Sequence, residues 1–343
     1  MMRLMDGNII RIGVFDTVYS LFLYFLKFGY DSEDILILSS GIPIEVENNI
    51  NHVYFPDIKL VGNKNNIFVW FYKNFHNGLK LIYGIIKLRI RLFFKTRNKQ
   101  VEVYGQAHLT FSFPLYEYEN SYLIEDGLGN YLDLQQPPKF NKILSKLLHF
   151  FGIYITNIKQ GFGTHHNIKK IYLTKNNPPE LIKDKVELMD LDELWNHKSD
   201  IEKKKILEIF NLEGIEEIFG QNITLLLTEP FSEHELLPFE EEISIYGEFI
   251  EKYPNIIIKT HPRENKDYAK LFSGVKVINV PFPVELLKYV GVKIDKIVTI
   301  CSTAALNFQD VEIEIYDKKT SSDHINNAIR LLNEKLNDKE DDK

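Results

Sequence analysis

The sequence predicts an α/β protein with largely parallel sheets, and three observations support this prediction. Short runs rich in Ile, Val and Leu, such as residues 9–15 and 255–260, have the length of buried strands. Apolar residues at helical spacing follow most of these runs, which is the rhythm of strand–helix–strand units. The rhythm occurs twice, on either side of a more polar section at residues 157–218.

The first half of the chain opens with a predicted strand at residues 9–15 and a helix at residues 18–28. β-Branched and aromatic side chains, which pack well on a pleated surface, mark the strands that follow. These strands are expected at residues 34–39, 52–55, 100–104 and 120–124.

The second half repeats the pattern. Strands are expected at residues 222–227, 255–260, 275–280, 296–300 and 312–316, with helices at 240–252, 284–290 and from 304. The sequence therefore predicts α/β domains at residues 1–155 and 219–343, joined by a connecting helical region at 156–218. Two Rossmann-like domains facing a central cleft form the arrangement called GT-B, which is the predicted fold.

Composition narrows the class of protein. The 343 residues have a formal net charge of -7, which does not favour general binding to nucleic acid. The single cysteine, Cys301, cannot form an internal disulfide, which fits a reducing compartment. Neither a signal peptide nor an apolar stretch long enough to cross a membrane is recognisable. A cytoplasmic location is therefore expected.

Two stretches combine basic and apolar residues, at 80–97 and 139–151. Basic amphipathic helices lie on anionic membrane surfaces, which would place the protein peripherally at the inner face of the plasma membrane. The same pattern is typical of a core helix whose lysines extend into solvent. The sequence leaves both interpretations open.

The most polar motifs follow the ends of predicted strands, where open parallel sheets bind their ligands. Asp126 stands between Glu125 and Gly127, directly after the strand at 120–124. A carboxylate at this place can deprotonate a hydroxyl group, and a glycine permits close approach of backbone or substrate. Asp-Gly is also a common turn pair, so a simple turn is the alternative.

A second motif ends the strand at 255–260 and contains Lys259, His261, Pro262 and Arg263. Histidine has a pKa near neutrality and can protonate or hydrogen-bond a departing phosphate. The two cations add positive charge suited to an anion. A structural histidine with neighbouring surface cations is the alternative.

Three further polar residues begin predicted helices. Ser302 and Thr303 stand between a strand and a helix, where hydroxyls and amide groups either bind an anion or cap the helix. Glu285 opens the helix at 284–290. Its carboxylate can accept hydrogen bonds from ribose hydroxyls or simply complement the helix dipole.

Together these motifs resemble those of bacterial sialyltransferases. The series Tyr-Leu-Ile-Glu-Asp-Gly, Ile-Lys-Thr-His-Pro-Arg, Pro-Phe-Pro-Val-Glu-Leu-Leu and Cys-Ser-Thr, within residues 122–308, is most similar to glycosyltransferase family 52. That family comprises lipooligosaccharide and capsule α2,3-sialyltransferases. The resemblance implies an inverting transfer of sialic acid from CMP-sialic acid to a galactose-type hydroxyl of a bacterial surface glycan. It further implies that no metal or other cofactor is needed, and that a homodimer can form.

The resemblance also implies roles for the matching residues. Asp126 would be the general base in the N-terminal, acceptor-side domain, with Glu125 and Gly127 beside it. His261 would be the general acid for the CMP phosphate in the C-terminal, nucleotide-binding domain. His108 either contacts the acceptor or has a structural role.

Donor binding is implied for the remaining matched positions. Ser302 and Thr303 would hold the phosphate, and Glu285 would hold the ribose. The backbone near Lys259 and Pro262, with Arg263 beside it, would contact the cytosine.

The identity of the base and the class of function have alternatives. Members of family 52 have a base assigned in the second domain, and the carboxylates in that region here are Glu229, Glu240, Glu241 and Glu242. A polysialyltransferase, another CMP- or CDP-dependent transferase such as a glycerophosphotransferase, and a non-catalytic sugar-nucleotide-binding protein are the competing functions.

Two patterns have some similarity to metal sites. Asp190 and Asp192 form an Asp-x-Asp pair in a polar helical stretch, far from the other motifs. His165 and His166 are adjacent, and adjacent side chains seldom point at one metal on regular structure. We therefore expect no metal site.

Overall fold

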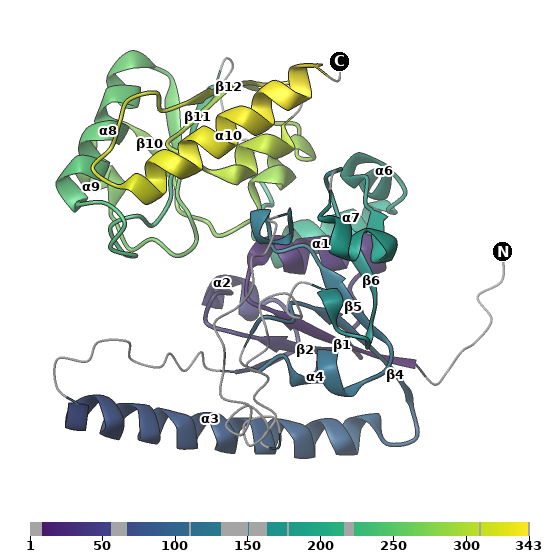
Figure 1. Cartoon of the computed structure of the whole chain (residues 1–343). Helices are drawn as coiled ribbons and strands as arrows, with labels where there is room; N and C mark the ends of the chain where they lie inside the picture. The colour runs from purple at the N-terminus through teal and green to yellow at the C-terminus, as the bar shows by residue number, and fades with distance from the viewer. Residues whose placement is uncertain are drawn as a thin grey trace. The chain divides into compact units, whose positions relative to one another are not determined.

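The computed structural model describes residues 9–55, 67–109, 111–131, 150, 163–176, 178–215, 223–308 and 310–341. The chain divides into two compact units, unit 1 (Met1–Ile206) and unit 2 (Leu207–Lys343). Each unit is built around one parallel β-sheet with helices packed against it (Figure 1).

The described residues of unit 1 form a seven-stranded sheet in the order β3-β2-β1-β4-β5-β6-β7, with every pairing parallel. The strands are β1 (Ile9–Phe15), β2 (Ile35–Leu38), β3 (His52–Tyr54), β4 (Gln100–Gly105), β5 (Ser121–Ile124), β6 (Ile168–Leu173) and β7 (Val186–Leu188). The order of strand addition reverses between β1 and β4. The carboxyl ends of these strands therefore flank a switch point, where open α/β sheets bind ligands.

Helix α1 (Val18–Phe28) has a clear start and end in the sequence. The Thr17 hydroxyl caps its N-terminus by accepting a hydrogen bond from the backbone N–H of Ser20, and Gly29 follows its end at a φ of 77°. The other α-helices and 3-10 helices (η) among the described residues of unit 1 are α2 (Ile44–Glu47), α3 (Ile67–Thr96), α4 (Phe113–Glu117), η1 (Leu128–Tyr131), η3 (Glu180–Lys185) and α6 (Leu191–Asn196). Helix α7 (Asp200–Ile209) crosses the boundary between the two units.

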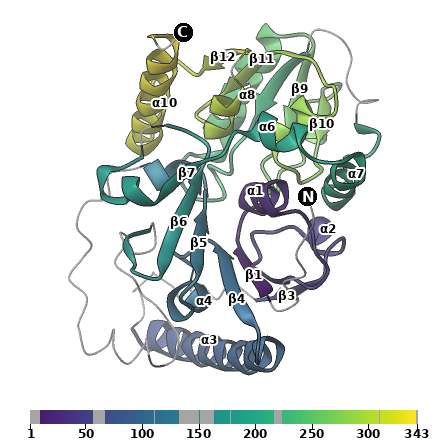
Figure 2. The same ribbon diagram turned by 90° about the vertical axis from the view of Figure 1, so that its right-hand side faces the viewer.

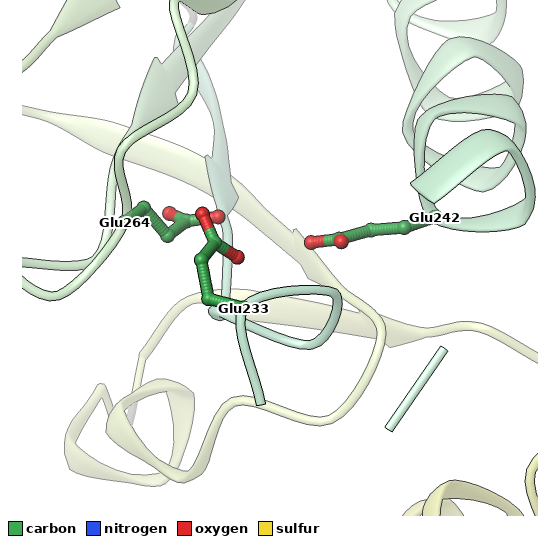
Figure 3. Close-up of side chains that lie close together, drawn as sticks. All are labelled: Glu233, Glu242 and Glu264. Carbon is green, nitrogen blue, oxygen red and sulfur yellow. The ribbon is translucent and has the colours of Figure 1, made fainter. Parts of the chain in front are cut away.

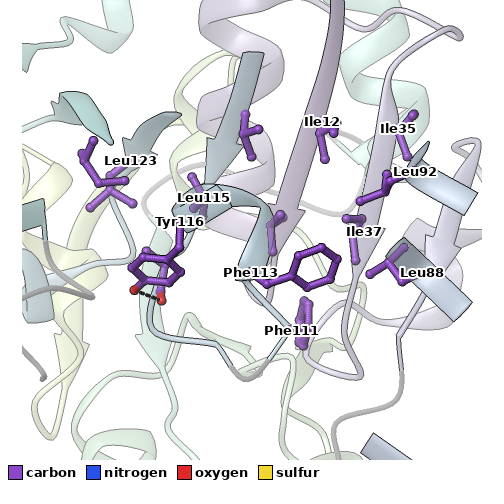
Figure 4. Packing of buried hydrophobic residues seen from close by; sticks show 14 of the residues in the cluster. Ile12, Ile35, Ile37, Leu88, Leu92, Phe111, Phe113, Leu115, Tyr116 and Leu123 are labelled. Atoms are coloured by element: carbon purple, nitrogen blue, oxygen red, sulfur yellow. Dashed lines mark hydrogen bonds between the residues drawn. The ribbon is translucent and has the colours of Figure 1, made fainter. Parts of the chain in front are cut away.

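The core of unit 1 lies between one face of its sheet and the helices α3 and α4, which lie on the same side of the sheet (Figure 2). Alternate residues of β1 enter this core because successive side chains of a strand point to opposite faces. From α3, residues three or four positions apart pack against the strands, as Figure 4 shows for Leu88 and Leu92. The α3 side chains of this core are Leu81, Ile85, Leu88 and Leu92.

The described residues of unit 2 form a five-stranded parallel sheet in the order β10-β9-β8-β11-β12. The strands are β8 (Ile223–Leu227), β9 (Ile256–Lys259), β10 (Lys276–Ile278), β11 (Ile294–Thr299) and β12 (Glu312–Ile315). This order repeats that of the first strands of unit 1. The switch point of unit 2 therefore lies between β8 and β11.

The helices of unit 2 follow the same amphipathic logic. Three glutamates occupy the first turn of α8, where negative charge complements the helix dipole, while Ile245, Tyr246 and Phe249 are buried. The described helical segments of this unit are α8 (Phe239–Lys252), α9 (Tyr268–Leu271), η5 (Val284–Lys288), η6 (Thr303–Asn307) and α10 (Asp323–Asp341).

The predicted α/β class with parallel sheets is confirmed, but the expected connecting helical region at 156–218 is wrong. This range contains β6 and β7, which are the last two strands of the first sheet. Lys169 and Lys170 interrupt the apolar pattern of β6, because both side chains are exposed between the buried Ile168 and Ile171. The two lysines hid this strand from the sequence pattern.

The two basic amphipathic stretches have different outcomes. Residues 80–96 of the first stretch lie within α3, and residue 97 follows it. The second, at 139–151, falls outside the described residues apart from Phe150. Within the described ranges, no helix is long and apolar enough to cross a membrane.

Candidate active site

The Asp126 carboxylate lies at the switch point of unit 1, just after β5. Its Oδ1 accepts a hydrogen bond from the Thr17 hydroxyl at 3.1 Å and another from the side-chain amide of Gln106. Gln106 is buried, and its own Oε1 accepts a hydrogen bond from the backbone N–H of Asp16. Because Gln106 is held at both ends, it fixes the orientation of the Asp126 carboxylate.

His108 lies against the other oxygen of the same carboxylate. The distance between His108 Nε2 and Asp126 Oδ2 is 3.2 Å. The His108 side chain is 33% exposed and the Asp126 side chain 17%, so the pair is partly open to solvent. A carboxylate next to an imidazole can take a proton from a hydroxyl group. The structure thus brings together two residues that the sequence motifs single out.

The backbone around Asp126 is also ordered by its own loop. The buried Asn130 accepts a hydrogen bond from the backbone N–H of Asp126 at 2.7 Å. Gly127 has a φ of 94°, while the space where a Cβ would stand is open. Gly127 is therefore needed for the backbone conformation and not for close packing.

Glu125 lies in the interior, unlike its neighbour Asp126. Its Oε2 accepts hydrogen bonds from the Tyr131 hydroxyl and the Thr174 hydroxyl, both at 2.7 Å. The carboxylate and burial together raise the pKa of Tyr131 well above its usual value, burial being the larger cause. Glu125 thus ties the loop after β5 to the segment that follows β6.

A second cluster lies at the carboxyl ends of three neighbouring strands of unit 2. Glu229 follows β8, His261 follows β9 and Ser302 follows β11. Glu229 Oε2 lies 4.0 Å from His261 Nε2, and Ser302 lies near enough to Glu229 to favour its charged form. The strand order therefore gathers side chains that are far apart in the sequence.

The hydrogen bonds of His261 define its tautomer. Its Nδ1 accepts a hydrogen bond from the backbone N–H of Arg263 at 3.1 Å, so the neutral ring carries its proton on Nε2. The backbone N–H of His261 donates to Glu264 Oε2 at 2.8 Å, which holds the loop in place. The Nε2–H group is then available as a hydrogen-bond donor on the side of Glu229.

The pKa values of His261 and Glu229 are shifted in opposite directions. Partial burial, with the charges of Arg263 and Lys259, lowers the pKa of His261 to about 3. Partial burial raises the pKa of Glu229 to about 7, although the nearby Ser302 side chain opposes the shift. In the free protein at neutral pH, His261 is therefore neutral and Glu229 is partly protonated.

Lys259 brings positive charge into the interior next to this cluster. Its side chain is buried, its Nζ donates to the carbonyl of Thr260 at 2.9 Å, and the ammonium lies 4.6 Å from the ring centre of Phe282. Burial lowers the pKa of Lys259 to about 8. A bound anion would stabilise the charged form of this lysine.

The remaining predicted donor-binding residues lie in η5 and η6. Glu285 is buried and accepts a hydrogen bond from the Asn307 side-chain amide, which links the two 3-10 helices. Ser302 precedes η6 and Thr303 begins it. The expected helix start at Ser302 is only a five-residue 3-10 turn, so its hydroxyls and not a helix dipole are the groups suited to an anion.

Glu264 is a residue of this site that the motifs did not single out. Its Oε2 accepts hydrogen bonds from His261 N–H and the Thr228 hydroxyl, and its Oε1 accepts from the Tyr268 hydroxyl at 2.6 Å. Glu264 thereby fixes the loop that presents His261. Its position directly after Arg263 could have indicated a role at the site. An exposed glutamate in a turn has the same sequence pattern, however, so the sequence does not distinguish the two.

Three glutamates of unit 2, Glu233, Glu242 and Glu264, lie close enough together to suggest a cation site (Figure 3). The ammonium of Lys266 already lies among them, at 2.5 Å from Glu233, 2.9 Å from Glu242 and 3.2 Å from Glu264. Its side chain is 5% exposed. Lys266 therefore occupies the place that a metal ion would take and balances the charge of this acidic trio.

The other candidate patterns have structural partners. Asp190 caps α6 by accepting a hydrogen bond from the backbone N–H of Glu193 at 2.9 Å. The ring of His165 packs edge-on against Tyr116, and its Nδ1 accepts from the backbone N–H of Asn167. Neither pattern has the arrangement of a metal site.

The four alternative bases in unit 2 are now distinguishable. Glu242 belongs to the acidic trio, Glu241 accepts hydrogen bonds from Ser321, and Glu240 is exposed in the first turn of α8. Among these four carboxylates, Glu229 is the one that lies beside His261.

Comparison with known proteins agrees with this architecture. Residues 44–321 match the sequence profile of glycosyltransferase family 52. An uncharacterized protein of Haemophilus influenzae is 31% identical over 278 residues, which cover 80% of this chain and 85% of that protein.

Two solved structures have a similar fold. One is the GT-B domain of a sialyltransferase from Photobacterium damselae, with a TM-score of 0.56, 16% identity, and coverage of 96% of this chain and 97% of that one. The other is an α/β-galactoside α-2,3-sialyltransferase from Photobacterium phosphoreum, with a TM-score of 0.54, 14% identity, and 96% of each chain covered. These similarities confirm the predicted GT-B-type fold. Because the family profile spans most of the sequence, the chain belongs to glycosyltransferase family 52 and is a glycosyltransferase.

Proposed function

We propose that this glycosyltransferase is an inverting sialyltransferase that transfers sialic acid from CMP-sialic acid to a galactose-type hydroxyl of a bacterial surface glycan, in lipooligosaccharide or capsule. The observation that supports this most is the pair of clusters at equivalent switch points: a carboxylate with an imidazole in unit 1, and an Nε2–H donor with hydroxyls in unit 2. The fold shared with two sialyltransferases supports the choice of sugar.

Unit 2 is assigned to the donor. As the bond from the anomeric carbon to the phosphate oxygen breaks, its electron pair remains on the phosphate, so groups that bind this charge lower the barrier. His261 Nε2–H and the hydroxyls of Ser302 and Thr303 are such groups, and Lys259 adds positive charge. The phosphate raises the pKa of His261 because an anion favours the imidazolium. His261 then acts as the general acid.

Unit 1 is assigned to the acceptor. The acceptor hydroxyl attacks the anomeric carbon from the face opposite the phosphate, which inverts its configuration. Asp126 accepts the hydroxyl proton through Oδ2, while Gln106 and Thr17 hold Oδ1. His108, at 3.2 Å from Oδ2, helps to place this proton.

The reaction is proposed to need no metal ion. A monophosphate leaving group has less charge than a diphosphate, and the donors named above match that charge. The acidic trio does not add a cation site, because Lys266 lies within it. EDTA should therefore leave the rate unchanged.

The test is transfer from CMP-sialic acid to lactose or N-acetyllactosamine in the presence of EDTA, with both sialylated product and released CMP measured. Asp126→Asn and His261→Ala should each lower kcat by roughly 100-fold to 10,000-fold, the usual contribution of a general base or acid. His197→Ala, which changes an exposed histidine of unit 1, is the matched control and should have wild-type activity.

Each other outcome has a distinct meaning. An Asp126→Asn variant with normal activity would move the base to Glu229, the carboxylate beside His261. Release of CMP without product would keep the donor and change the acceptor, for which polysialic acid is the next choice. Turnover of CDP-glycerol alone would identify a glycerophosphotransferase. CMP binding without any turnover over a broad acceptor panel would contradict the proposal and favour a binding protein.

A further inference from the structure

Helix α3 has a second apolar face in addition to the one that packs in the core. Its exposed large apolar residues repeat at intervals of four, three, four and three, so they form one continuous stripe along the helix. Phe94 lies next to the end of this stripe. The side chains of Phe94 and of the five stripe residues are between 42% and 70% exposed. The stripe consists of Leu79, Tyr83, Ile86, Ile90 and Phe93.

The same part of α3 is strongly basic. Between Leu79 and Arg97 the sequence contains six cations and no Asp or Glu, although the whole chain has a net charge of -7. Arg89 pairs with Glu117, and the other five make no ion pair with any described residue. The six cations are Lys80, Lys87, Arg89, Arg91, Lys95 and Arg97.

The combination of this stripe and these charges identifies the kind of partner. A second copy of the chain on the same face would bring two sets of cations together, and like charges across an interface oppose association. An anionic lipid surface instead offers negative headgroups to the cations and an apolar boundary to the stripe. Exposed Tyr and Phe side chains suit that boundary, because aromatic rings insert at the headgroup level.

We propose that α3 is an interfacial helix whose exposed face, between Leu79 and Arg97, binds anionic lipid bilayers. The opposite face of the helix, which includes Leu81, Ile85 and Leu88, stays packed in the core of unit 1, so the helix need not leave the fold to bind. This would hold the protein at a membrane surface through one face of a helix that stays within the fold. The proposal does not depend on the reaction that the protein catalyses.

The test is sedimentation of the 343-residue protein with vesicles. Vesicles of phosphatidylcholine with roughly one-third phosphatidylglycerol should bind it, pure phosphatidylcholine should bind it much less, and high salt should weaken binding. Replacing both Phe93 and Phe94 with Ser should lower the partition coefficient roughly tenfold or more, because the apolar contact is lost. Replacing both Lys87 and Arg91 with Glu should lower the partition coefficient by a similar factor.

Matched variants exclude general effects. Ile201→Ser removes an apolar side chain of α7 that is even more exposed than Phe93 and Phe94, and Lys293→Glu with Lys319→Glu replaces two exposed cations of unit 2 with anions. Both controls should bind vesicles as the wild type does. Circular dichroism and thermal melting of every variant establish that the fold is retained.

Three results would overturn the proposal. They are no binding to phosphatidylglycerol vesicles, binding that both the Phe93/Phe94 and Lys87/Arg91 variants retain, and equal loss of binding in the control variants. If the wild type instead forms a dimer that the Phe93/Phe94 variant does not, and no vesicle binds, the stripe is an interface between two copies of the chain.

Discussion

The two clusters occupy equivalent places in their sheets but orient their key side chains by different means. In unit 1, neutral groups hold Asp126: the Thr17 hydroxyl and the Gln106 amide. In unit 2, the loop of His261 is held by a buried carboxylate, Glu264, whose charge Lys266 balances. Neutral dipoles act at hydrogen-bond range, whereas charges act further and shift neighbouring pKa values. We therefore expect the cluster of unit 2 to be most sensitive to the loss of charged groups and to pH. The cluster of unit 1 should be most sensitive to substitutions that alter its hydrogen-bond geometry.

The largest expected effect is removal of the Lys266 ammonium. Lys266→Met leaves Glu233, Glu242 and Glu264 without their shared cation, and breaking a buried ion pair costs about 3 kcal/mol or more of unfolding free energy. Added Ca²⁺ should raise the melting temperature of this variant and not that of the wild type, because carboxylate oxygens are its preferred ligands. Thermal unfolding with and without Ca²⁺ measures both effects.

Lys270→Met is the control for this variant. Lys270 is an exposed lysine in the same segment and pairs with Asp267, so its loss should leave the melting temperature close to that of the wild type. If Lys266→Met melts like the wild type without metal, charge balance does not hold the loop of His261. The contrast between the two clusters would then be incorrect.

The next effect concerns Glu229 and pH. The pKa of Glu229 is raised to about 7 in the folded protein, so folding favours its protonated form, and that stabilisation is lost as pH rises from about 4.5 to 7. Glu229→Gln removes this dependence. Relative to the wild type, it should gain roughly 2–3 kcal/mol of unfolding free energy between pH 5 and pH 8.

Denaturant unfolding of both proteins at the two pH values measures this difference. The pKa of His261 is lowered, so its contribution weakens as pH falls below about 6.5, but it is present in both proteins and cancels to first order. Ser232→Ala, which alters a neighbouring loop residue without removing a titrating group, should show no such difference. If the difference in unfolding free energy between the wild type and Glu229→Gln is the same at pH 5 and pH 8, the pKa of Glu229 is not raised in the folded protein.

The smallest effect sharpens the description of unit 1. Gln106→Leu keeps the side-chain volume but removes the amide that holds Asp126 Oδ1. We expect kcat to fall roughly 10-fold to 100-fold, because misplacement of Asp126, the proposed base, would weaken proton transfer. The KM for the donor should stay the same, since donor binding is assigned to unit 2.

Gln106→Glu serves as the comparison for that variant. It restores an acceptor and not an N–H donor next to Asp126, so it should not recover the activity. Loss of donor affinity together with kcat would show that Gln106 acts through the fold as a whole. A normal kcat in Gln106→Leu would show that Thr17 alone suffices to orient the carboxylate.

Most strands were predictable because each depends on a local pattern. Residues 9–15, for example, form an apolar run that is buried as β1. The motifs at strand ends were equally local, so Asp126, His261 and Ser302 were all found from sequence. The strand β6 was missed because its pairing with β5 and β7 outweighs the two exposed lysines within it.

Local sequence by itself thus determined the α/β class, the positions of most strands and the residues placed at their carboxyl ends. The strand order decided which of those residues meet, since Thr17, Gln106 and Asp126 are brought together only by the neighbouring positions of β1, β4 and β5. Only the tertiary structure showed that Lys266 fills the acidic trio and that α3 keeps one apolar face exposed. The physical reason is that hydrophobic periodicity is a property of a segment. Charge balance, burial and proton affinity depend on neighbours that are distant in the chain.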